Sequence, residues 1–120
     1  MTSVLSRLRT VTDLLSGRRF PLEDEKATQR AIADVLDANL DEWARECSVD
    51  GGIIDFRALG DIGVEVKLKG QPAAILRQLE RYAADPTLAA LVLVTAKPVA
   101  LPLLIGGKPV RIIDLGKAWL

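Results

Sequence analysis

The chain has 120 residues, of which 49% are apolar and 27% charged, a composition typical of one globular domain. Sixteen basic residues balance sixteen acidic ones, so the chain lacks the basic surplus common among nucleic-acid-binding proteins, although a local basic rim is compatible with this balance. Because it has no histidine and only one cysteine, Cys47, the sequence excludes an internal disulfide, Cys/His zinc sites and histidine-based catalysis. A bound metal would need oxygen ligands, which suit magnesium, manganese or calcium.

The first predicted element is a helix over residues 3–16. Apolar residues recur there at helical spacing, at Val4, Leu5, Leu8, Val11, Leu14 and Leu15. The stretch "SGRRFP" interrupts this pattern. A second helix is expected to start near Pro21, which suits a first helical turn, and to run to about Leu40. Three consecutive acids at 23–25 favour the N-terminal end of that helix.

The rest of the chain alternates strand and turn signals around a third helix. Strands are predicted at 42–49, 53–59, 63–69, 88–96 and 108–116, and the third helix at 72–84. The run at 88–96 is almost entirely apolar, which is typical of a strand buried on both faces. The segment 97–107 is compatible with a loop or a short helix.

This element order predicts an α/β fold, in which one domain has a mixed sheet flanked by helices. We expect a single domain over residues 1–120, with its core at 21–115 and the N-terminal helical segment, 1–20, as a candidate interface for a homodimer. That segment is charged and amphipathic and lacks the apolar centre of a signal peptide. No run of about 20 apolar residues offers a membrane span, so we expect a cytoplasmic protein with no membrane partner.

The two strands of the predicted hairpin alternate apolar and charged residues. The charged face holds Asp55, Arg57, Glu65, Lys67 and Lys69, and the apolar face holds Ile54, Phe56, Ala58, Val64, Val66 and Leu68. A three-residue loop at Gly60–Ile62 keeps both faces consistent and gives the pairs Asp55–Lys67 and Arg57–Glu65. Such charge pairs contribute only about 0.2–1 kcal/mol and are common, so an ordinary solvated hairpin is the competing interpretation.

Two helical residues add polar groups to the same region. Glu25 lies on one helical stripe with Gln29, Ile32 and Leu36, so it is expected to point toward the fold. The alternative for Glu25 is an acid that only stabilises the helix N-terminus. Gln78 falls on the apolar stripe of the third helix, four residues before Tyr82, where a buried amide needs partners. Its alternative is an ordinary polar residue at the edge of that stripe.

This constellation resembles the PD-(D/E)xK nuclease superfamily. The resemblance rests on Asp55, on Glu65-Val66-Lys67 after a hairpin-sized gap, and on Glu25 in the preceding helix. The stretch from Gln78 to Tyr82 is similar to the Q-x-x-x-Y motif of the lambda-exonuclease branch. The resemblance covers roughly residues 21–95 with a final strand near 108–115, and it implies a restriction-endonuclease-like αβββαβ core.

The resemblance also implies a chemistry for these residues. Asp55 and Glu65, with the Val66 carbonyl, would hold Mg²⁺ or Mn²⁺, which neutralises phosphate charge and lowers the pKa of bound water. Lys67 would orient or help deprotonate that water, and Glu25 would bind the metal through water or a second ion. Gln78 and Tyr82 would support the site or contact DNA. Candidate phosphate contacts are Lys69, Arg77, Arg81, Arg18 and Arg19, for each of which a solvated surface charge is the competing interpretation.

The leading hypothesis is therefore a metal-dependent DNA nuclease, such as a junction resolvase or another DNA-processing nuclease. Small members of the superfamily include junction resolvases that work as dimers, and the apolar stripe of helix 3–16 would serve such an interface. The alternative is a non-catalytic nucleic-acid- or protein-binding module that retains the nuclease fold. A third hypothesis, a structural α/β protein with a charged hairpin, predicts that Glu25, Asp55 and Glu65 lie apart and bind no divalent metal.

Overall fold

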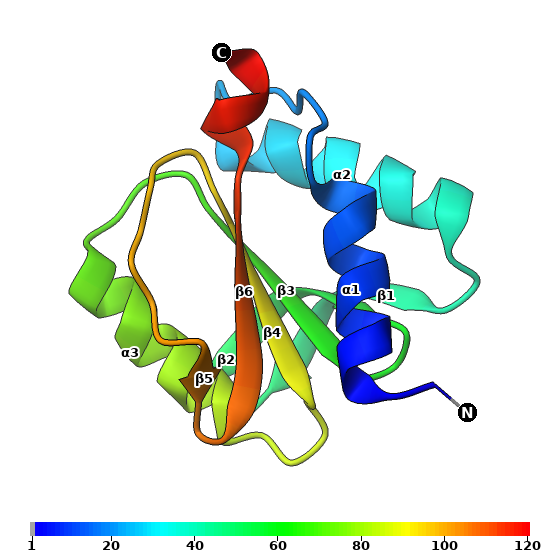
Figure 1. Ribbon diagram of the computed structural model, residues 1–120, viewed down its shortest axis with the longest axis vertical. Coiled ribbons are helices and arrows are strands. Elements are labelled where there is room, and N and C mark those ends of the chain that lie inside the picture. The colour runs from blue at the N-terminus through cyan, green and yellow to red at the C-terminus, as the bar shows by residue number, and fades with distance from the viewer. Residues whose placement is uncertain (1) are drawn as a thin grey trace.

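The computed structural model describes residues 2–120, which form three α-helices, six strands and a C-terminal 3₁₀ helix (Figure 1). In chain order the elements are α1 (Val4–Leu15), α2 (Glu25–Asn39), β1 (Trp43–Val49), β2 (Gly52–Ala58), β3 (Ile62–Lys67), α3 (Pro72–Ala83), β4 (Ala90–Thr95), β5 (Leu104–Ile105), β6 (Lys108–Asp114) and η1 (Leu115–Trp119). No helix within residues 2–120 combines the length and the apolar character that crossing a membrane requires.

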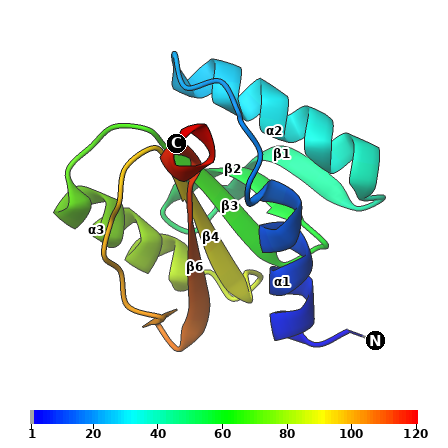
Figure 2. The same ribbon diagram turned by 45° about the horizontal axis from the view of Figure 1, so that its top comes forward.

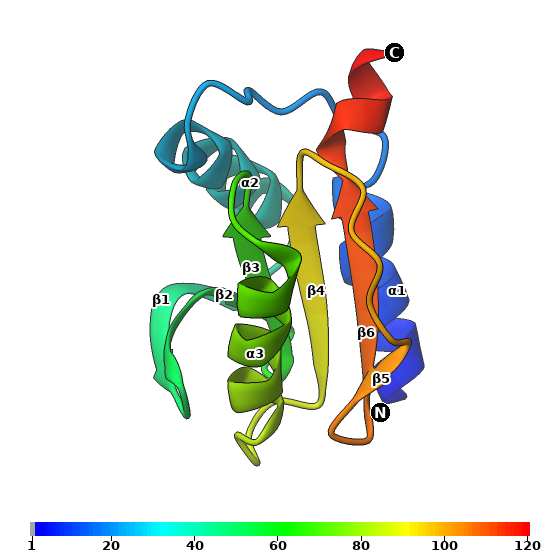
Figure 3. The same cartoon turned by 90° about the vertical axis from the view of Figure 1, so that its left-hand side faces the viewer.

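The strands form one mixed sheet in the order β1-β2-β3-β4-β6-β5. Strands β1, β2 and β3 are antiparallel neighbours, whereas β3, β4 and β6 run parallel. Helices α1 and α2 cover one face of the sheet and α3 covers the other (Figures 1 and 3). Every residue of β4 is buried, as expected for a central parallel strand between two helical layers. The predicted α/β class is therefore confirmed.

The register of the β2–β3 hairpin differs from the predicted one by two residues. The observed pairs are Ala58–Ile62, Arg57–Gly63 and Phe56–Val64. The loop is three residues long, as predicted, but it comprises 59–61 rather than 60–62, because Leu59 and Gly60 both adopt positive φ, at 53° and 86°. A shift of two residues preserves the side-chain faces, so the charged and apolar faces of β3 are still separated.

The apolar side chains of β2 switch from one face of the sheet to the other halfway along the β1–β2 hairpin. Its register continues on both sides of Glu46 and Asp55, but these two residues do not pair, and Glu46 adopts a positive φ of 54°. On one side of this break Phe56 packs beneath α1 and α2, and on the other side Ile54 packs beneath α3. The prediction that Ile54 shares a face with Phe56 is therefore wrong. Gly63 makes room for Ile54, since a Cβ there would lie 2.6 Å from Ile54 Cδ1.

Helix α2 starts at Glu25, four residues later than predicted. Asp24 is the N-cap, and its carboxylate accepts a hydrogen bond from Ala27 N at 2.7 Å. At the other end of the chain, β6 ends at Asp114, two residues earlier than predicted. The Asp114 carboxylate accepts a hydrogen bond from Gly116 N and so caps the start of η1. The segment 97–107 is a loop that ends in the short strand β5.

Helix α1 packs into the core of its own chain. Leu8, Val11 and Leu15 are buried with residues of α2 and of the central strands. Half of the predicted interface stripe is thus used within the chain, while Leu5 remains 57% exposed. The homodimer itself stays a prediction.

Candidate functional site

Two hydrogen bonds tie Asp55 to the Glu65–Val66 segment of β3. The Asp55 N–H donates to Glu65 Oε1 at 3.2 Å, and the Val66 N–H donates to Asp55 Oδ2 at 2.7 Å. Asp55 lies beyond the last β2–β3 pair, at Phe56–Val64. The two carboxylates thus take over backbone donors where the strands diverge, which fixes both side chains relative to the sheet.

Lys67 lies beside this carboxylate pair. Its Nζ is 3.2 Å from Glu65 Oε2, with Glu65 only 3% exposed and Lys67 28% exposed. The predicted opposition of Asp55 to Lys67 and of Arg57 to Glu65 does not occur, because the register is shifted. The Arg57 guanidinium instead donates to the carbonyls of Gly60 and Thr87.

Helix α3 supports Glu65 from the opposite side. The Tyr82 hydroxyl donates to the Ile53 carbonyl at 3.0 Å and lies 3.4 Å from Glu65 Oε2. Gln78 Nε2 donates to the same hydroxyl at 2.8 Å. The Gln78 amide thus has the partner that a polar group on the apolar stripe needs, and Tyr82 is fully buried.

Glu25 reaches the end of β3 from the first turn of α2. Its Oε1 accepts a hydrogen bond from Leu68 N at 3.1 Å, one residue beyond Lys67. Among the three consecutive acids, Asp24 is used as the helix cap and Glu25 points toward the sheet, as the helical stripe predicts. Glu25 is close enough for its charge to contribute to raising the pKa of Asp55.

Burial and mutual repulsion make this group of side chains electrostatically unusual. Burial, and then the neighbouring charge of Asp55, raise the pKa of Glu65 to about 7, although Lys67 opposes this shift. Burial also raises the pKa of Asp55, against the Val66 hydrogen bond and the charge of Lys67. The Tyr82 pKa is raised by burial and by the adjacent Glu65. Three acids thus share one lysine, an arrangement that favours an additional cation.

The predicted phosphate contacts are more dispersed. Lys69, Arg77 and Arg81 are exposed and form no side-chain hydrogen bond or ion pair with any residue of 2–120. Arg18 donates to the Leu14 carbonyl, and Arg19 donates to the Ala118 carbonyl. Only Lys69 lies in a hollow next to the cluster. That hollow, of about 350 Å³, lies between the start of α2 and the ends of β3 and β4, and Glu25 also lines it.

The oxygen atoms of this cluster are the type of ligand that a hard divalent cation prefers, but they are fewer than such a cation needs. Within the described part of the chain, no three Asp, Glu, His or Cys side chains lie at metal-ligating spacing. Two carboxylates and a backbone carbonyl are nevertheless the type of partial site that Mg²⁺ uses when water and substrate phosphate complete its ligands. Asp55, Glu65 and the Val66 carbonyl therefore fit such an ion, with Glu25 nearby.

Sequence reasoning missed the backbone groups of this site. The Val66 N–H, the Asp55 N–H and the Ile53 carbonyl all hold functional side chains, and no sequence signal marks them because they depend on where β2 leaves β3. It also missed Lys97, which lines the same hollow as Lys69 from the end of β4. Comparisons of the chain with protein-family models, with curated proteins and with solved structures gave no match.

Proposed function

We propose that this protein is a metal-dependent nuclease of the PD-(D/E)xK class that hydrolyses phosphodiester bonds in DNA. The observation that carries the proposal is the geometry of Asp55, Glu65 and Lys67. Two carboxylates from adjacent strands accept hydrogen bonds from backbone N–H groups of the opposite strand, Glu65 from Asp55 and Asp55 from Val66, and the Lys67 ammonium lies 3.2 Å from Glu65. A solvated hairpin would instead place these charges in water, where nothing would hold them together.

In this proposal Asp55, Glu65 and the Val66 carbonyl would hold Mg²⁺ or Mn²⁺. When bound, the ion would supply positive charge against the phosphate and activate water. The chain prepares the site for it, because the Asp55 and Val66 N–H groups fix both carboxylates and Tyr82 holds the outer oxygen of Glu65. Gln78 in turn fixes the Tyr82 hydroxyl, which makes both helical residues positioning residues.

Lys67 has a separate role in this proposal. Its ammonium is partly exposed while its partner Glu65 is buried, so the positive charge is presented at the mouth of the site. There it would stabilise negative charge on a phosphate oxygen and orient an attacking water. Glu25, which accepts a hydrogen bond from Leu68 directly after β3, would receive a proton or orient water on the same side.

The test is cleavage of labelled single strands, linear duplexes, flaps and four-way junctions in Mg²⁺ or Mn²⁺. Asp55→Ala and Lys67→Ala are each expected to lower the rate of cutting by roughly 100-fold or more. Asp34→Ala and Lys26→Ala are matched controls, since both residues are exposed on α2, and they should cut at the wild-type rate. Cutting that persists in both site variants would refute the assigned site.

A non-catalytic module that retains this cluster is the second candidate. It is favoured by the closed hydrogen-bond network, because every buried side-chain polar atom in residues 2–120 already has a partner. A cluster that is complete without a ligand can simply anchor β2 to β3 and α3. This candidate predicts no cleavage of any substrate and no heat of Mn²⁺ binding in calorimetry.

A further inference from the structure

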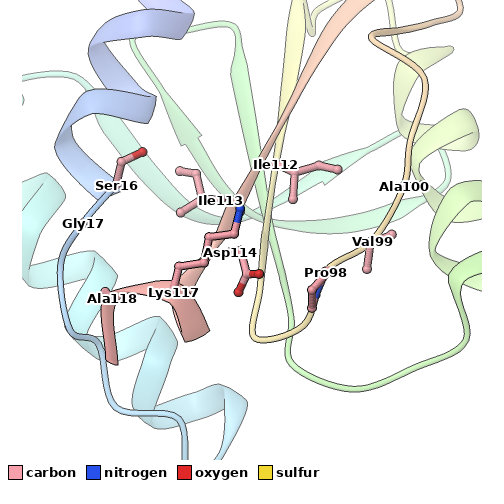
Figure 4. Close-up of a pocket in the computed structure, with 10 residues that line it drawn as sticks. All are labelled: Ser16, Gly17, Pro98, Val99, Ala100, Ile112, Ile113, Asp114, Lys117 and Ala118. Carbon is pink, nitrogen blue, oxygen red and sulfur yellow. The ribbon is translucent and has the colours of Figure 1, made fainter. Parts of the chain in front are cut away.

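The end of the sheet where β3, β4 and β6 terminate carries two hollows. The larger one, of about 780 Å³, lies between the loop after β4 and the end of β6 (Figure 4). Pro98 and Val99 line it on one side, and Ile112, Asp114 and Lys117 line it on the other. Crevices at the carboxyl ends of parallel strands are common ligand sites in open α/β sheets. A cavity of this size, mainly apolar with a few polar groups, can accommodate a planar group such as a base.

The larger hollow leads back to the candidate active site. The loop after β4 connects it to the 350 Å³ hollow, because Lys97 lines the smaller hollow and the adjacent Pro98 lines the larger one. The smaller hollow is also lined by Lys69 and by Glu25, whose carboxylate contacts the end of β3. Figure 2 turns this end of the molecule forward and shows η1 and the start of α2 above the strand ends. The two hollows thus meet at residues 97–98, and the smaller one is lined by Leu68 and Lys69, which directly follow Lys67.

Several exposed cations that form no ion pair within residues 2–120 lie at this end of the sheet. They are Arg18, Arg19, Lys69, Lys97 and Lys117. Most acids at the same end have backbone partners: Asp24 caps α2, Asp114 caps η1 and Glu25 accepts from Leu68 N. Glu23 is the remaining one. Three of the four carboxylates at this end are thus hydrogen-bonded to backbone N–H groups, whereas the five cations are exposed and form no ion pair in the described part of the chain.

An aromatic ring lies at the same end of the sheet. Trp119 in η1 is 50% exposed, and its ring nitrogen donates to the Phe20 carbonyl at 3.2 Å, which fixes its orientation. The Arg19 guanidinium lies 5.5 Å from the ring centroid. Fixed aromatic rings and arginines beside a groove with exposed lysines are elements that bind unpaired bases and the phosphates between them.

We infer that this edge is a binding track for single-stranded nucleic acid, which leads the strand to the Asp55–Glu65–Lys67 site. The lysines on the rims contact phosphates, the larger hollow takes a base, and Asp114 offers an acceptor to a base N–H group, such as N3–H of thymine or uracil. A single strand is favoured over a duplex because bases must leave the helix to enter an apolar hollow or stack on Trp119. The inference rests on the proposed function only in stating that the bound nucleic acid leads to the Asp55–Glu65–Lys67 site, since binding itself needs no catalysis.

The test measures binding of twelve-nucleotide oligodeoxythymidylate and oligouridylate, and of a twelve-base-pair duplex, in EDTA. The paired substitution Lys97→Gln with Lys117→Gln should weaken binding of the single strand about 10-fold or more at 50 mM salt. It should also reduce the slope of log affinity against log salt by about 1.4, since each phosphate contact in a single strand contributes about 0.7. The matched control, Arg9→Gln with Arg111→Gln, removes two charges beside α1 and should change affinity less than 2-fold.

Fluorescence provides the second measurement. The chain has two tryptophans, so Trp43→Phe leaves Trp119 as the sole reporter, and the single strand should quench its emission. Equal weakening by both paired substitutions, tighter binding of the duplex, or unchanged Trp119 emission at saturation would each overturn the track. Binding with these properties but without any metal-dependent cutting would preserve the track and refute the nuclease. Whichever of the two oligonucleotides binds more tightly identifies the strand as DNA or RNA.

Discussion

Glu65 is the least exposed acidic residue in the described part of the chain. It is 3% exposed, and it faces Asp55, Lys67 and Tyr82, with Glu25 acting on Asp55 from α2. Its pKa is raised to about 7 from an ordinary value of 4.5 because burial and the charge of Asp55 disfavour the carboxylate. The folded state therefore retains a proton over a pH range in which the unfolded state has already lost it.

This difference gives a stability that depends on pH. In EDTA, the free energy of unfolding should fall between pH 4.5 and pH 7 by on the order of 2 kcal/mol from this group alone, because the folded state binds more protons there. The Gln side chain in Glu65→Gln cannot ionise, so the free energy of unfolding of this variant should not show this fall. The difference in free energy of unfolding between Glu65→Gln and the wild type should therefore shift in favour of the variant from pH 4.5 to pH 7 and be constant above pH 7. Urea unfolding at half-unit pH steps measures the effect.

Glu80→Gln is the control for this prediction, since Glu80 is exposed on α3 and its substitution removes the same charge. Its free energy of unfolding should follow the wild-type curve. A constant difference between wild type and Glu65→Gln from pH 4.5 to pH 8 would show that the proton affinity of Glu65 is unchanged by folding.

At the scale of the elements, sequence periodicity predicted which way side chains point better than it predicted which residues pair across strands. The alternation in β2 and β3 correctly separated the charged from the apolar side chains of β3, and the stripe in α2 correctly directed Glu25 toward the sheet. The register was wrong by two residues because it is set by the left-handed backbone of Leu59, a conformation that its sequence does not indicate. The side-chain faces survived this error because the period of a strand is two.

The change of face in β2 could not be predicted for a related reason. It follows from the unpaired position at Glu46 and Asp55, where Glu46 has a positive φ that non-glycine residues rarely adopt. This irregularity moves Ile54 beneath α3 and leaves the Asp55 N–H free to meet Glu65. The two hydrogen bonds that link Asp55 to Glu65 and Val66 therefore arise from tertiary geometry rather than from a local motif.

Helix α2 places Glu25 only if its first turn is stable. Asp24→Ala removes the cap on Ala27 N and should lower the free energy of unfolding by about 1 kcal/mol. Asp34→Ala, in the exposed middle of the same helix, removes the same charge without a capping bond and should change stability by less than about 0.5 kcal/mol. Denaturant unfolding of the two variants measures the difference, and equal losses would mean that the cap contributes nothing.

At the scale of the whole molecule, α1 decides whether the chain is one cooperative unit. Its inner residues belong to the same core as α2 and the central strands, and Arg7 ties it to the hairpin loop through an ion pair with Asp61 at 2.7 Å. A helix held in this way is part of the folded core. A helix kept for a partner would instead stabilise the protein only at high concentration.

Two leucines of α1 separate these cases. Leu15 is fully buried, so Leu15→Ala leaves a cavity and should lower the free energy of unfolding by about 2–5 kcal/mol. Leu5 is 57% exposed, and Leu5→Ala should change the free energy of unfolding by less than about 1 kcal/mol. Because the core contact is within one chain, the midpoint of unfolding should be the same at 1 µM and at 100 µM protein for both variants. A Leu5→Ala loss that appears only at the higher concentration would show that the outer side of α1 stabilises an association between copies.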